Sequence, residues 1–193
     1  ETTGGIQNQP AIVHLTGGGY VIAWASNDNT IRTQLFDGDG QAVGHEQTVN
    51  TYTASWQYTP TLSATADGGY VLVWASNAQD GDSRGIYART FDSDGDPVSA
   101  ILDVNQRTEG DENTPDVTVL SNGNFAVTWQ GFHNDEGVWT IHVRLYDGDG
   151  TPLTDEVTVG ADSEHSRTTP KIIEMADGGF VVAWPGFTDD TTA

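Results

Sequence analysis

Pairs of aspartates separated by one residue recur three times in the chain, each pair directly before a glycine. Two carboxylates on a tight bend suit a hard cation that takes several oxygen ligands at about 2.3–2.6 Å, so calcium is the expected ion. Another interpretation stays open, because Asp-Gly is also a preferred dipeptide of metal-free hairpin turns. With one further acid that follows the second pair, the metal-ligand candidates are Asp37, Asp39, Asp92, Asp94, Asp96, Asp147 and Asp149.

A second set of candidates is aromatic and polar. Exposed aromatic rings beside Asn and Asp predict a carbohydrate platform, in which the ring face contacts sugar C–H groups and the polar groups hydrogen-bond the hydroxyls. In the alternative interpretation, Trp56 and Trp139 pack loops against sheet edges, as large aromatic residues are usually well buried. The ligand-binding candidates are Trp56, Tyr58, Phe132, His133, Asn134, Asp135 and Trp139.

These candidates belong to a chain that repeats itself. Prolines at 10, 60, 115 and 170 are each followed fourteen residues later by a tryptophan, so the period is 50, then 55, then 55 residues. The difference in period lies between the tryptophan and the next isoleucine, where six residues stand in the first copy and eleven in the others. This loop therefore tolerates insertion, and the ligand-binding candidates lie in it or in the linkers between copies.

Each repeat predicts four short antiparallel strands and no helix. In the first unit the apolar runs are Ala11–Leu15, Tyr20–Trp24, Ile31–Phe36 and a last strand near Glu46–Val49, separated by Gly, Asp and Asn. Four-strand units of this length are typical of propeller blades. The expected fold is all-β, a propeller-like array in one repeat domain over 1–193, with units at about 10–59, 60–114 and 115–169 and a partial unit at 170–193.

Three full units and the first hairpin of a fourth are too few for a closed ring, which typically has four to eight blades. The open ends therefore have to be covered, either by neighbouring repeats of a longer chain or by other copies in a homo-oligomer. Both arrangements remain open at this stage.

Composition excludes two classes of partner. The 193 residues carry 28 acids against 7 Lys and Arg, a formal net charge of −21, and no cysteine. Such a surface repels nucleic acid, and no apolar run approaches the roughly 18 residues of a membrane-spanning helix. An acidic, cysteine-free chain folds best where salt or divalent cations screen its self-repulsion, so an extracellular setting is expected.

The repeat resembles a known group of sequences. The segments GGGYVIAW, DGGYVLVW, NGNFAVTW and DGGFVVAW, together with IRTQLFDGDG, IYARTFDSDG and IHVRLYDGDG, are similar to repeats of very large secreted bacterial proteins that often carry RTX-type calcium-binding repeats and adhesin modules. The resemblance covers Pro10 to Trp184. It implies a secreted or cell-surface protein that binds calcium and has a glycan or another cell-surface ligand.

Catalytic motifs are absent from the sequence. It contains no G-x-S-x-G elbow, no H-E-x-x-H pair and no S-x-D-x-G-x-T-W box, and its five histidines fall at unrelated repeat positions. The expected function is therefore a non-catalytic, calcium-stabilised and glycan-binding repeat module of an adhesin-like protein. A self-assembling architectural propeller unit without a small ligand is the alternative, and a propeller glycosidase or lyase is the third hypothesis.

Overall fold

The computed structural model describes residues 5–133, 135, 137–160 and 165–188, and all regular structure in these ranges is β-strand. Three successive sheets have four strands each, in chain order and antiparallel. Blade 1 contains β1 (Gln7–His14), β2 (Tyr20–Ser26), β3 (Thr30–Phe36) and β4 (Ala42–Thr48). Blade 2 contains β5 (Gln57–Ala64), β6 (Tyr70–Asn77), β7 (Arg84–Phe91) and β8 (Leu102–Asp103). Blade 3 contains β9 (Asp111–Val119), β10 (Phe125–Phe132), β11 (Trp139–Tyr146) and β12 (Val157–Val159).

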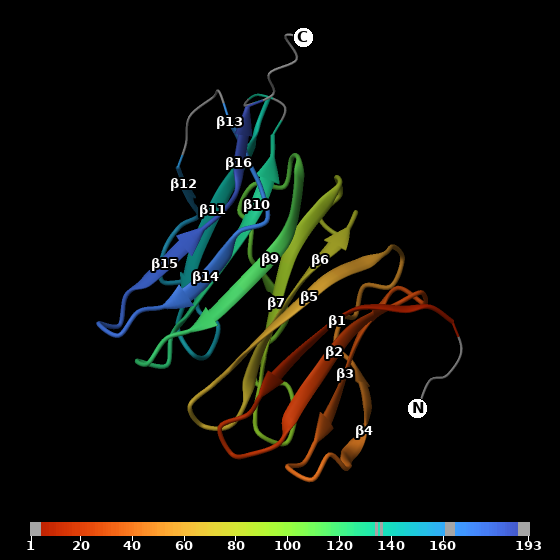
Figure 1. Ribbon diagram of the computed structural model, residues 1–193. Coiled ribbons are helices and arrows are strands. Elements are labelled where there is room, and N and C mark those ends of the chain that lie inside the picture. Colours follow the sequence, from red (N-terminus) through yellow and green to blue (C-terminus); the bar gives the residue numbers. More distant parts are fainter. Residues whose placement is uncertain (1–4, 134, 136, 161–164, 189–193) are drawn as a thin grey trace.

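The fourth unit is a hairpin in two parts. Strand β14 (Lys171–Glu174) pairs with β15 (Phe180–Ala183), and the outer part joins β13 (His165–Arg167) to β16 (Gly186–Thr188). Figure 1 shows the sheets side by side, with β1, β5, β9 and β14 as consecutive neighbours on the inner side. The expected propeller-like array of four-stranded blades is confirmed. The described residues form no helix that is long and apolar enough to cross a membrane.

The core lies between the blades. One cluster joins blades 1 and 2 and a second joins blades 2 and 3, and the repeated Trp74 and Trp129 are fully buried in them. Strand β6 is buried at every position from Tyr70 to Ser76, because both of its faces are covered by a neighbouring blade. Its uninterrupted apolar sequence is the signature of such a strand.

The glycine pair before the second strand of blades 1 and 2 has a steric cause. At Gly69 an added Cβ would overlap the carbonyl oxygen of Phe91, and at Gly19 it would overlap that of Phe36. The turn therefore brings the backbone of the third strand against the second at a distance that only glycine permits.

The innermost strands carry an irregularity that the sequence did not predict. The residue before each repeated proline has a positive φ, 51° at Gln9, 46° at Thr59 and Thr114, and 53° at Thr169. The pairing register of the first three innermost strands shifts at the same place. A non-glycine residue with positive φ is uncommon and costs free energy, so the repeated contacts of the fold must compensate for it.

Candidate functional site

The four irregular dipeptides line a groove between the innermost strands. Its cavity has a volume of about 370 Å³, and Ala11, Thr61 and Lys171, the residues that follow three of the prolines, complete the lining. The hydroxyls of Thr59 and Thr114 are buried here and have no hydrogen-bond partner among the described residues. The groove therefore presents polar groups that are available to a ligand.

Asp116 follows the third proline and interacts with two lining residues of this groove. One carboxylate oxygen lies 3.2 Å from Nζ of Lys171 and accepts a hydrogen bond of 3.3 Å from Oγ1 of Thr61. The other oxygen accepts the backbone N–H of Ile172 at 3.0 Å. Asp116 is 14% exposed and Lys171 70%, so the pair combines a fixed carboxylate with an accessible ammonium group. At the equivalent position blades 1 and 2 have only Ala11 and Thr61.

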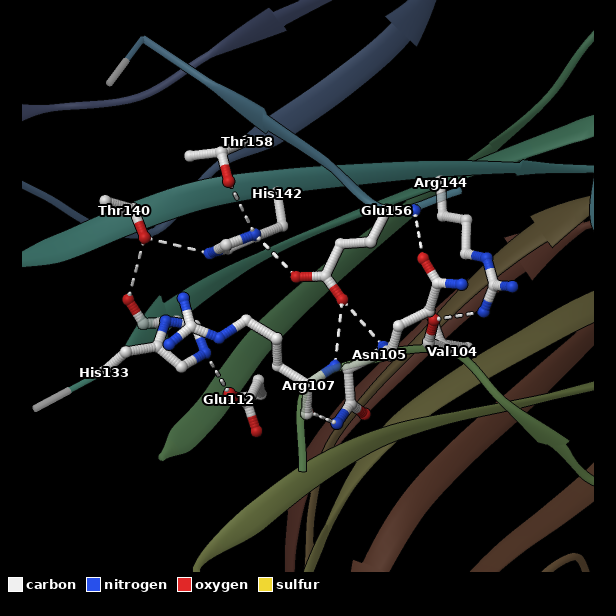
Figure 2. A network of polar contacts seen from close by, with 12 residues as sticks. Val104, Asn105, Arg107, Glu112, His133, Thr140, His142, Arg144, Glu156 and Thr158 are labelled. Carbon is white, nitrogen blue, oxygen red and sulfur yellow. Dashed lines mark hydrogen bonds and ion pairs between the residues drawn. The ribbon is translucent and has the colours of Figure 1, made fainter. Parts of the chain in front are cut away.

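A buried acid–histidine cluster lies in blade 3, on the face toward blade 2 (Figure 2). Nε2 of His133 lies 3.0 Å from a carboxylate oxygen of Glu112, and each of these side chains is 1% exposed. Nδ1 of His142 lies 2.8 Å from the carboxylate of Glu156, and Nε2 of His142 lies 2.9 Å from Oγ1 of Thr140. The two imidazole rings meet edge to face with centroids 5.4 Å apart. Two acid–histidine pairs are thus held in one water-poor cluster.

The two carboxyl groups of this cluster are shifted in opposite directions. Burial raises the pKa of Glu112, and the nearby His133 offsets only part of that effect. Burial alone would also raise the pKa of Glu156, but the hydrogen bonds from His142 and from the backbone N–H groups of Gln106 and Arg107 outweigh it and lower the pKa. Carboxyl groups with opposite shifts in one cluster are the arrangement from which acid and base roles are drawn in enzymes.

Comparison of the blades shows that Glu112 is a departure from the repeat. Its equivalent in blade 2 is Gln57, whose Oε1 accepts the indole N–H of Trp74 at 3.0 Å. In blade 3 the indole N–H of Trp129 is buried and has no partner among the described residues. Glu112 therefore contacts His133, whereas the glutamine at this position in blade 2 accepts a hydrogen bond from the tryptophan indole.

The predicted aromatic platform is distributed over two loops. Trp56 is 50% exposed, and Tyr58, on the same linker, lies under the guanidinium of Arg84, 5.9 Å from the ring centroid. On the other loop Phe132 contacts Trp139, with ring centroids 5.4 Å apart.

The polar members of the predicted platform differ in their placement. Asp135 is exposed and pairs with Arg107 at 2.9 Å, whereas Asn134 lies outside the described residues. His133 is not on this surface but buried against Glu112, because its side chain turns into the interface between blades 2 and 3.

The paired aspartates form the predicted hairpin turns. In each turn, one oxygen of the first aspartate accepts two backbone N–H groups, as Asp92 does from Asp94 at 3.0 Å and from Asp96 at 2.9 Å. Asp37 and Asp147 make the equivalent pairs of hydrogen bonds. The second aspartates, Asp39, Asp94 and Asp149, are exposed.

Calcium binding at these turns stays a prediction. Within the described ranges no three or more His, Asp or Glu side chains are arranged to hold a metal ion. The hydrogen bonds of the turns explain why an aspartate recurs at the first position of each pair, by hairpin geometry alone and without a metal ion.

Sequence reasoning missed Glu112, Asp116, His142 and Glu156, which the structure makes the most constrained polar groups of blade 3. The signal that could have found them is the comparison of equivalent repeat positions. Glu112 stands where the earlier units have Gln7 and Gln57.

Comparison with known proteins adds information on the fold. No family model matches the chain, and no curated protein sequence is similar to it. Among solved structures, an α-L-arabinofuranosidase from Fusarium graminearum in complex with an iminosugar inhibitor has a TM-score of 0.67 at 15% identity and covers 95% of this chain and 60% of its own. An α-L-arabinanase from Penicillium chrysogenum complexed with arabinobiose has a TM-score of 0.66 at 15% identity, with 95% and 61% covered.

An endo-arabinase from Bacteroides thetaiotaomicron is also similar, with a TM-score of 0.55 at 15% identity and with 93% of this chain and 71% of its own covered. The chain thus spans about 60% of the length of the first two enzymes. At such identities the likeness establishes the propeller fold of the chain.

The expectation of a non-catalytic adhesin-like module is wrong in the light of these structures. Three of the structures that share the fold over nearly the whole chain are named as an endo-arabinase, an α-L-arabinanase and an α-L-arabinofuranosidase. The absence of short catalytic motifs misled the sequence analysis, because the acids of a propeller come together through the stacking of blades and have no fixed spacing along the chain.

Proposed function

We propose that this chain forms part of a carbohydrate-active β-propeller enzyme whose groove between the innermost strands binds a sugar unit. The observation that carries the proposal is the position of Asp116, a fixed carboxylate beside a cavity of about 370 Å³ at the inner side of the blades. Hydroxyl, carboxylate and ammonium groups around one cavity are the donors and acceptors that sugar hydroxyls require.

Similar solved propellers support the choice of ligand. One is complexed with arabinobiose and another with an iminosugar inhibitor. Glycoside hydrolysis uses an ionised carboxylate and a protonated carboxylic acid. Asp116 is assigned the first role, because its carboxylate is held beside the cavity by Thr61, Lys171 and the backbone of Ile172.

The test uses the whole chain with arabinan, arabinoxylan and β-1,3-galactan as substrates and arabinobiose as a binding probe. Release of reducing sugar measures activity, and calorimetry measures binding. Asp116→Asn is expected to lower sugar release at least tenfold. Asp94→Asn is the matched control, since it removes the same charge from an exposed turn.

Absence of binding and of sugar release across this panel would overturn the proposal. Unchanged activity of a folded Asp116→Asn variant would remove the assignment of the groove. Circular dichroism of each variant establishes that a lost activity does not come from lost structure.

A further inference from the structure

One position in the third strand of each blade holds a different polar residue: Arg32 in blade 1, Tyr87 in blade 2 and His142 in blade 3. Each lies directly opposite the repeated tryptophan of the second strand. The three side chains therefore occupy equivalent places in their sheets, and their surroundings can be compared.

In blade 1 this place holds a cation between two acids. Nη2 of Arg32 lies 2.6 Å from Asp28 and Nη1 lies 3.6 Å from Glu46. A hydrogen bond from the Thr30 hydroxyl has the largest effect on the pKa of Asp28. Burial opposes this effect, but the guanidinium of Arg32 adds to it, so the pKa falls to about 2. Both carboxylates thus share one cation from within the blade.

Blade 2 has Tyr87 in place of the arginine, and two acids from other repeat positions lie near it. Asp80 comes from the loop between the second and third strands, and Asp103, an exposed residue, lies opposite Tyr87 on the last strand, where blade 1 has Thr48. Both acids line a cavity of about 330 Å³ together with Gln79, Tyr87, Asn105 and Thr108. All six offer oxygen atoms, and no Lys, Arg or His is among the described residues of this lining.

Several of these oxygens have no partner among the residues that the structure describes. Oε1 of Gln79 and Oδ2 of Asp80 are buried without a hydrogen bond. Tyr87, which lines the same cavity, is only 2% exposed. A methyl group on Gly85 would lie 2.7 Å from Oδ2 of Asp80 and 3.2 Å from Oδ1 of Asn105, so these two oxygens converge over the glycine.

The charge around this cavity is not balanced from within. Burial raises the pKa of Tyr87, and the negative charges of Asp80 and Asp103 raise it further. Unpaired buried oxygens and carboxylates are costly unless a cation or donor meets them.

We infer that this cavity of blade 2 binds a hard cation, calcium in the first instance, in the place that the guanidinium of Arg32 takes in blade 1. Asp80 and Asp103 supply the charge, and the unpartnered amide oxygen of Gln79 supplies a neutral ligand, which calcium accepts readily. The site is separate from the aspartate hairpin turns and from the groove of the innermost strands, and it does not depend on the proposed activity.

The experiment titrates the EDTA-treated whole chain with CaCl2 by calorimetry, and with Tb3+ in parallel, because an ion beside Tyr87 accepts excitation energy from the aromatic rings. One saturable site is expected. Asp80→Asn and Asp103→Asn are expected to weaken it at least tenfold, whereas Asp94→Asn, an exposed turn acid, leaves it unchanged.

The Tyr87→Arg variant provides the decisive comparison. It places the cation of blade 1 between the two acids of blade 2, so it is expected to abolish calcium binding while the protein without calcium melts at least as high as the wild type. The inference is overturned if the wild type shows no saturable site, if Asp80→Asn and Asp103→Asn bind as the wild type does, or if a folded Tyr87→Arg variant keeps the site.

Discussion

Glu112 shows how one residue can change the chemistry of a blade whose backbone stays the same. The repeat places glutamine at this position in blade 2, where Gln57 satisfies the buried indole of Trp74. In blade 3, Glu112 instead faces His133, and the indole N–H of Trp129 is left without a described partner. A structure selected only for stability has no reason to keep this exchange, which argues for a functional role.

The double substitution Glu112→Gln with His133→Ala rebuilds blade 3 after blade 2, which has Gln57 and Ala78 at these positions. We expect the free energy of unfolding at pH 7 to rise by about 1–3 kcal/mol, because the indole gains a hydrogen bond and a buried carboxyl group is removed. Urea unfolding measures the change. A lower stability than the wild type would contradict it and would show that the contact between Glu112 and His133 itself stabilises the fold.

The dependence of this gain on pH follows from the pKa shifts. The pKa of Glu112 is raised above its ordinary value of 4.5, so its contribution to stability is present below pH 4.5 and is lost as the pH rises. The free energy of unfolding of the double variant should therefore exceed that of the wild type by more at pH 7 than at pH 4. Glu156 has a lowered pKa, so Glu156→Gln should cost stability above pH 4.5, and this cost should fade on further acidification.

The sequence predicts some site residues better than others. Exposed Trp56 and the turn aspartates follow from local rules, and the structure places them as those rules expect. Glu112 and Asp116 do not, because their roles depend on residues brought close by blade stacking, His133 in one case and Lys171 in the other. No spacing along the chain encodes such a contact.

Within each hairpin turn, the first aspartate has a structural role, and only the second is free to contribute mainly through its charge. Because one oxygen of Asp92 accepts two backbone N–H groups, Asp92→Ala should lower the free energy of unfolding by about 1–2 kcal/mol, whereas Asp94→Ala should change it by less than about 0.5 kcal/mol. Urea unfolding in EDTA measures both. If calcium binds at these turns, Asp94→Ala would also lose a stabilisation that appears only with calcium, and equal losses for both variants in EDTA would contradict the turn assignment.

Strands and hairpins were predictable because each has a local cause: alternation or runs of apolar residues, and glycine or aspartate at the turns. The kink before each proline was not. A residue before proline is biased toward extended conformations, yet Thr59 and Thr114 adopt a left-handed one. Only the packing of neighbouring innermost strands favours this conformation, and that packing is a tertiary effect.

The formal net charge of −21 dominates the long-range electrostatic interactions of the whole molecule. We expect the melting temperature to rise by several degrees between 10 mM and 0.5 M NaCl, because salt screens the mutual repulsion of the acids over a Debye length that falls from about 30 Å to a few ångströms. Differential scanning calorimetry at fixed pH measures it. The Asp80→Asn variant should show the same rise, which separates screening from specific ion binding, and a flat salt dependence would contradict the expectation.

The fold class was predictable from repetition, whereas the function was not. Repeated residues such as Trp74 and Trp129 indicate how the blades pack and give no information on the chemistry of a functional site. The informative positions are those at which the units disagree, such as Arg32, Tyr87 and His142, and their meaning appears only when the blades are superimposed.

Because each of the three four-stranded sheets is formed by consecutive strands, local opening of the structure differs from blade to blade. Strand β6 of blade 2 is buried on both faces, whereas the hairpin β14–β15 exposes Ile173 and Val181. Amide hydrogens should therefore exchange slowest in the second blade and fastest in the fourth. Pairing is also local in sequence, so each blade can form as soon as its four strands have left the ribosome, and the entropy of closing long loops never has to be overcome.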